Sequence, residues 1–232
     1  MAVTLKKNFN VDLKVYNNYI KDYEAKIAEI HKTLNELYDA LDGCIMNKQY
    51  WCDDNALDFV KWFKLNYNTS DSYEATYATI KTVFSQTGRA VCTEIMKSQP
   101  TSYSKYAYIK KYAGKGSIWD ALEAKYKSTK VNKMFTNTTV TNNIKADKMV
   151  VDIMYKAVIE KTNKLRTLGD ELGNMVLAFG VGNKGVSIDG LDCSAKARLI
   201  ARLSVFNSPL KKKLQECITK TNGLDGIVNV TK

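Results

Sequence analysis

Apolar side chains in the first forty-one residues recur alternately four and three positions apart. Neither proline nor glycine interrupts the chain from Val11 to Asp42. Because this spacing puts the apolar side chains on one narrow face of a helix, it predicts a long helix that packs against a partner helix. At 1.5 Å per residue, a helix from Val11 to Leu41 would be about 45 Å long. This apolar face, called the seam below, consists of Tyr16, Ile20, Tyr23, Ile27, Ile30, Leu34, Leu37 and Leu41.

The composition favours the same class of fold. The 232 residues, 45% of them hydrophobic, suffice for the core of one large domain or two small ones. Only two prolines and twelve glycines occur, which favours long uninterrupted helices over a strand-rich fold. We therefore predict a mainly all-α class, in which long antiparallel helices form helical hairpins or a bundle. An irregular basic insertion in the middle has room for one short strand.

Residues 1–99 are predicted to form an N-terminal helical hairpin. Gly43 suits the end of the seam helix, and Asp53 or Asp54 suits the N-cap of a short helix. A second long helix with the same spacing is predicted from Tyr73 to Ile95. The short helix between them would bury Ala56, Phe59, Val60 and Phe63.

Residues 100–145 are predicted to form a basic, Tyr-rich arm or insertion. From Lys97 to Lys148 the chain carries eleven lysines against three acidic residues, so this stretch holds +8 of the net charge of +11. Lysines interleaved with tyrosines can neutralise phosphates and stack on bases, which suits single-stranded nucleic acid. Tyrosine also suits a protein interface, so a polyanion and a protein partner are both open alternatives. The residues favoured for this contact are Lys105, Tyr106, Lys110, Lys111, Tyr112 and Lys115.

Residues 146–232 are predicted to form a C-terminal helical part. A third long helix from Ala146 to Phe179 is followed by a glycine-rich connector, and Ser208 before proline starts a further helix that ends near Gly223. The tail from Ile227 to Val230 is predicted as a short edge strand. The third helix would carry Met149, Val150, Ile153, Ala157, Leu165, Leu168, Leu172, Val176 and Phe179, and the last helix Leu210, Leu214, Cys217 and Ile218.

No motif predicts catalysis, a cofactor or a metal. His31 is the only histidine, which excludes an HExxH zinc motif, and the five cysteines contain no CxxC pair. The stretch Gly180–Gly185 matches GxGxxG in letters, but a dinucleotide site needs a strand before it and a helix after it. The sequence predicts a helix before this stretch and no helix start after it. We therefore predict that the chain is not an enzyme and binds no cofactor or metal.

The N-terminal residues, the longest apolar runs and the number of cysteines bear on where in the cell the protein is located. The N-terminal residues lack the apolar segment of a signal peptide, and no run approaches eighteen uncharged apolar residues. The odd number of cysteines suits thiols in a reducing compartment. We predict no signal peptide and no membrane span, with the chain in the cytoplasm or within a virus-like particle.

Trp51 lies in the connector between two predicted helices and is our candidate for a hairpin anchor. Trp51-Cys52-Asp53 occupies the place of Trp-x-Gly in WXG100-type helical hairpins, the small export partners of type VII secretion, and Ala56 and Phe59 continue that pattern. Residues 11–97 therefore resemble this family, although Asp53 replaces its glycine. The resemblance implies a secreted helical hairpin.

Three functional hypotheses follow. The leading one is a non-enzymatic, self-associating helical structural or assembly protein, such as a virion or filament subunit, whose partners are copies of itself or other subunits. The second is a nucleic-acid-binding or packaging protein that uses the basic middle segment. The third is the WXG100-like secreted hairpin.

Overall fold

The computed structural model of the chain describes residues 3–5, 13–46, 50–67, 97, 101–102, 107, 134–140, 146–182, 186–188 and 208–230. This part of the chain is mostly helical, which confirms the predicted mainly α-helical class. The predicted second long helix, Tyr73–Ile95, lies outside the described residues.

The chain divides into two compact units, each built from three separate stretches. The first unit contains Met1–Ala28, Tyr77–Ser128 and Asp170–Ala201, and the second contains Glu29–Thr76, Thr129–Gly169 and Arg202–Lys232. The predicted boundaries near residues 99 and 145 are not tested by the described residues and stay a prediction.

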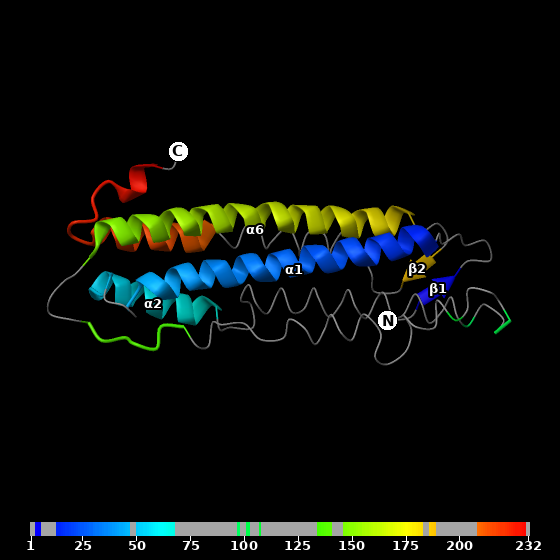
Figure 1. Cartoon of the computed structure of the whole chain (residues 1–232), viewed down its shortest axis with the longest axis horizontal. Coiled ribbons are helices and arrows are strands. Elements are labelled where there is room, and N and C mark those ends of the chain that lie inside the picture. Colours follow the sequence, from blue (N-terminus) through cyan, green and yellow to red (C-terminus); the bar gives the residue numbers. More distant parts are fainter. Residues whose placement is uncertain are drawn as a thin grey trace. The chain divides into compact units, whose positions relative to one another are not determined.

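Helix α1 spans Leu13–Cys44 and contains the predicted seam (Figure 1). It extends past Leu41, and the N–H of Ile45 still donates to the carbonyl of Leu41 at 2.9 Å. The seam residues of the second unit, Ile30, Leu34, Leu37 and Leu41, are buried. The side chains of Tyr16, Ile20, Tyr23 and Ile27 lie outside the described part.

Helix α2 spans Asp54–Tyr67 and begins at the predicted cap. The carboxylate of Asp53 accepts the backbone N–H of Ala56 at 2.8 Å, because the first N–H groups of a helix have no partner within it. The four residues predicted to face the core, Ala56, Phe59, Val60 and Phe63, are all buried.

Helix α6 spans Lys148–Gly182 and is capped by Asp147, which accepts the backbone N–H groups of Met149 and Val150 at 3.1 and 3.2 Å. It begins two residues after the predicted start. Its first turns bury a different face from the predicted one, since Met149 and Ile153 are 73% and 58% exposed. The buried side chains there are Val151, Met154, Tyr155, Val158 and Ile159.

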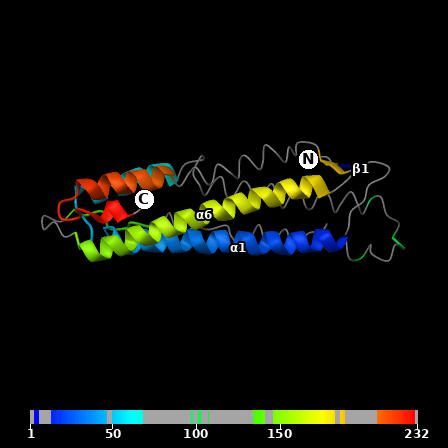
Figure 2. The same cartoon turned by 90° about the horizontal axis from the view of Figure 1, so that it is seen from above.

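Residues 208–220 are helical and run beside the first half of α6 (Figures 1 and 2). Their predicted core residues, Leu210, Leu214, Cys217 and Ile218, are buried. The predicted edge strand at the tail is wrong, because Ile227–Val230 forms the 3-10 helix η2. Gly223 and Gly226, with φ of 83° and 88°, turn the chain back so that Leu224 and Ile227 are buried.

The two strands of the described residues lie in the first unit. Strand β1, Val3–Leu5, pairs antiparallel with β2, Val186–Ile188, and Val3 lies opposite Ile188. The first three GxGxxG letters, Gly180 to Gly182, belong to the end of α6, and β2 follows the last letter. This order is the reverse of that in a dinucleotide-binding motif.

Part of the predicted insertion is fixed to the second unit at Phe135, which is fully buried. Its backbone N–H donates to the Asp42 carboxylate at 2.7 Å, and its carbonyl accepts the Lys64 ammonium at 3.1 Å. Its ring meets that of Phe63 edge to face, with centroids 5.5 Å apart. With φ of 53°, Phe135 adopts a left-handed conformation that costs about 1 kcal/mol or more, so these contacts must offset that strain.

Candidate functional site

The six residues predicted to contact a polyanion or partner are not placed by the structure. Lys105, Tyr106, Lys110, Lys111, Tyr112 and Lys115 lie outside the described residues. Their role stays a prediction. The features below belong to the described part of the second unit, apart from one ion pair of the first unit.

Trp51, the predicted hairpin anchor, lies in the segment of chain that connects α1 to α2, and its side chain is fully buried. Its carbonyl accepts the N–H of Met46 at 2.9 Å, and its backbone forms β-bridges with Ile45 and Ala146. Its indole N–H donates to the hydroxyl of Thr221 at 3.1 Å. Trp51 therefore contacts the segment that follows α1, the segment that precedes α6 and the residue that follows the 208–220 helix.

The Thr221 hydroxyl joins Trp51 to Asp53 in a buried polar network. It lies 2.7 Å from Asp53 Oδ2 and 3.1 Å from the carbonyl of Cys217. A hydroxyl has one proton to donate, and the ionised carboxylate is the stronger acceptor. We therefore assign that proton to Asp53, whose other oxygen caps α2. The sequence predicted Asp53 as a cap but contains no signal for its link to Thr221.

Three cysteines, Cys44, Cys52 and Cys217, are buried free thiols. Burial, together with the charge of Asp147, raises the pKa of Cys44 to about 12. Burial also raises the pKa of Cys217. Since the thiolate is the nucleophile and the metal ligand, the raised pKa lowers the reactivity of both thiols at neutral pH. Among the described residues, no cluster of His, Cys, Asp and Glu is suited to holding a metal ion.

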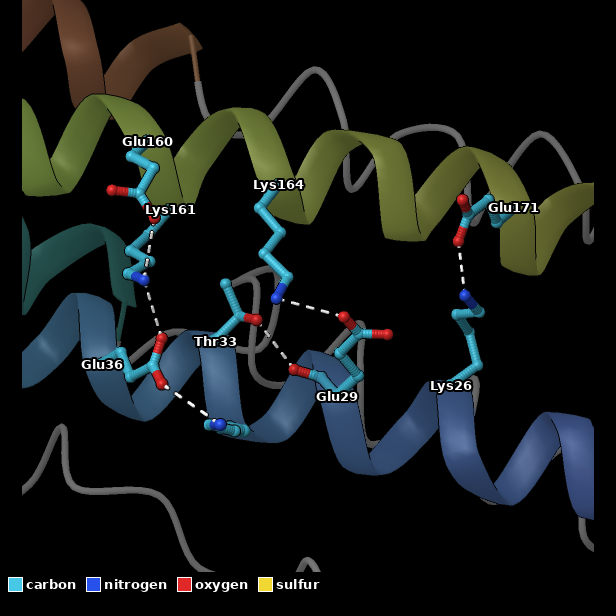
Figure 3. Close-up of polar contacts among 9 residues, drawn as sticks. Lys26, Glu29, Thr33, Glu36, Glu160, Lys161, Lys164 and Glu171 are labelled. Carbon is cyan, nitrogen blue, oxygen red and sulfur yellow. Dashed lines mark hydrogen bonds and ion pairs between the residues drawn. The ribbon is translucent and has the colours of Figure 1, made fainter.

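Ion pairs join α1 to α6 (Figure 3). In the second unit, Lys161 binds Glu36 at 2.9 Å and Lys164 binds Glu29 at 3.1 Å. Glu36 follows Glu29 along α1, whereas their lysine partners occur in the reverse order along α6. The two helices therefore run in opposite directions. The hydrogen bond from Lys161 lowers the pKa of Glu36 and raises that of Lys161. In the first unit, Lys26 pairs with Glu171.

A solvent-facing stripe covers the first turns of α6. We call it the α6 outer stripe, and it consists of Lys148, Met149, Asp152, Ile153, Lys156 and Glu160. Met149 and Ile153 are two of the most exposed large apolar side chains of the described residues. Lys156 pairs with Asp152 at 2.7 Å, and Glu160 pairs with Lys161 at 3.0 Å. The signal that could have revealed this surface is the alternation of charge every four residues.

The run Lys211–Lys213 forms a second charged surface, on the 208–220 helix. Lys212 is exposed, while Lys211 and Lys213 are half-buried. Within the described part of the chain, none of the three takes part in an ion pair. Their positive charges are therefore not neutralised by any carboxylate that the structure places.

Comparison of the chain with protein-family models, curated proteins and solved structures gives no match. The resemblance to WXG100-type hairpins therefore rests on the residues around Trp51 alone and stays a prediction. In the portions of the chain that the structure describes, no helix is both long and apolar enough to span a membrane.

Proposed function

We propose that this chain is a non-enzymatic helical assembly protein that associates with copies of itself, as a virion or filament subunit does. The proposal includes the finer architecture predicted from the sequence, in which long antiparallel helices form a hairpin or bundle. The observation that carries it is the exposure of Met149 and Ile153, one helical turn apart on α6.

Removing exposed apolar side chains from water is favourable, so it promotes association. Full burial of a Met or Ile side chain is worth about 1.5–3 kcal/mol. Two such residues on one helix face form a patch that a second protein surface can cover, whereas most of the other large apolar residues of α6 in this unit are already buried. Leu65 on α2, 69% exposed, adds a further apolar contact point.

Sedimentation velocity of the purified chain over a wide range of concentration tests this function. We expect the weight-average sedimentation coefficient to rise with concentration, and negative-stain electron microscopy to reveal the assembly formed. A single monomeric species at every concentration would refute self-association.

A second candidate function, polyanion binding, is supported by the lysines at 211–213, which form no ion pair with another described residue, together with the net charge of +11. Replacing the three lysines by glutamine should weaken binding to single-stranded nucleic acid and reduce its dependence on salt. Binding that does not change with salt concentration would contradict this function.

A further inference from the structure

The charges of the α6 outer stripe alternate in a regular way. Lys148, Asp152, Lys156 and Glu160 are positive, negative, positive and negative at four-residue intervals. All four side chains reach solvent, and those of Asp152, Lys156 and Glu160 are 29%, 55% and 69% exposed. Read from its other end, the same series is negative, positive, negative and positive.

We propose that the α6 outer stripe pairs with the same stripe of a second copy, the two α6 helices lying antiparallel about a two-fold axis near Met154. This proposal rests on the self-association proposed above and specifies its surface. A two-fold interface brings one patch against itself, so the patch must be complementary to itself. Here Lys148 lies opposite the partner's Glu160, and Asp152 lies opposite the partner's Lys156.

The parallel arrangement is disfavoured by the same charges. It would place each lysine opposite a lysine and each carboxylate opposite a carboxylate, which is repulsive at every position. The antiparallel register makes all four positions attractive, because the two-fold axis makes each of the two distinct contacts occur twice.

The exposed apolar residues fit this register. Ile153 lies one residue from the axis, so the two copies of Ile153 are offset along the helices by only about 3 Å. Met149 lies level with residue 159 of the second copy, between the partner's Lys156 and the partner's Glu160, whose alkyl stems offer apolar surface below their charged head groups. Both side chains that are exposed in one copy therefore become covered in the pair.

The ion pairs within one copy are compatible with the second copy. Asp152 already binds Lys156, and Glu160 already binds Lys161. An ionised carboxylate has about four acceptor positions, so each can accept a lysine of the partner as well. Because the stripe covers only about four helical turns, the pair is expected to be weak and dependent on concentration.

Charge exchange tests the pairing. Lys156→Glu places negative against negative at two symmetric positions, and Asp152→Lys places positive against positive. We expect each variant alone to dimerise about 30-fold more weakly, equal to about 2 kcal/mol, from two contacts that change from attraction to repulsion. An equimolar mixture of the two variants should recover dimerisation, because every facing pair is then opposite in charge. The double variant D152K/K156D should dimerise like the unmodified chain.

The matched control is Arg166→Glu, an exposed charge reversal on α6 outside the stripe, and it should leave dimerisation unchanged. Circular dichroism verifies that each variant folds, and recovery in the mixture cannot arise from two unfolded chains. If the unmodified chain associates but Lys156→Glu associates equally well, this interface is wrong while self-association holds through another surface. If the unmodified chain is monomeric throughout, both proposals fail.

Discussion

Replacing Thr221 by valine should destabilise the second unit by about 3 kcal/mol, because valine keeps the shape of threonine without its hydroxyl. The indole N–H of Trp51, fully buried, would lose its acceptor at 3.1 Å. Leaving such a donor unpaired costs about 1–3 kcal/mol. The Asp53 carboxylate would lose its 2.7 Å donor, a hydrogen bond to a charged group worth about 1.5–3 kcal/mol. It would keep weaker support from Asn55 at 3.2 Å.

Urea unfolding, followed by circular dichroism and tryptophan fluorescence, measures this change as a lower midpoint. Thr221→Ser is expected to retain most of the stability because it keeps the hydroxyl. The matched control is Thr219→Val, two residues earlier, where the exposed hydroxyl donates to the carbonyl of Gln215 at 2.8 Å. An exposed substitution of this kind changes stability by about 0.5 kcal/mol or less.

An equal loss of unfolding free energy in Thr221→Val and Thr219→Val would contradict this prediction. That result would mean that the Trp51–Thr221–Asp53 network contributes no more than an ordinary exposed hydroxyl. A large effect of Thr221→Ser would also contradict it, since the proposed cause is the hydroxyl and not the methyl group.

Three further predictions concern the same unit. Phe135→Ala should lower the unfolding free energy by about 3–5 kcal/mol in urea titrations, whereas the exposed Thr138→Ala should have little effect. The pKa of Cys44 is raised from an ordinary 9.0 to about 12, so the unfolded chain releases this proton first as pH rises. Stability should therefore fall above pH 9 by up to about 1.4 kcal/mol per pH unit from this thiol, and Cys44→Ala should show a shallower decline. Glu36→Gln should cost less than about 1 kcal/mol and still less in high salt, since its ion pair with Lys161 lies near the surface. Because that pair lowers the pKa of Glu36, its contribution should be present at neutral pH and lost in acid.

Features that depend on neighbouring residues could be predicted closely. The Asp53 cap and the four buried residues of α2 agree with the structure because helical periodicity and capping are local properties. The predicted stop at Gly43 was wrong, because α1 continues through Gly43 to Cys44 and the left-handed residue is Met46, with φ of 62°. The prediction was wrong at Ile227–Val230, where β-branched residues favoured a strand. Left-handed glycines at 223 and 226 and the burial of Leu224 and Ile227 outweighed that preference.

Apolar periodicity did not locate the exposed face in the first turns of α6. Residues 149–159 contain apolar side chains on every face of the helix, so periodicity does not select which face is buried. The packing partners decide it, as when the hydroxyl of Tyr155 meets Gln215 of the 208–220 helix at 2.6 Å. Met149 and Ile153, on another face, are consequently left in solvent.

Local sequence is enough to specify that this chain forms long helices, where several of them begin, and which seam and α2 residues face a core. Repeat spacing, caps and the scarcity of proline and glycine act within a few residues and need no knowledge of the fold. The tertiary structure alone decided that Trp51 meets Thr221, 170 positions away, that Asp42 and Lys64 hold Phe135, and that an alternating charged stripe of α6 faces outward. Those contacts join residues far apart in the chain, and their formation depends on which helix faces pack together.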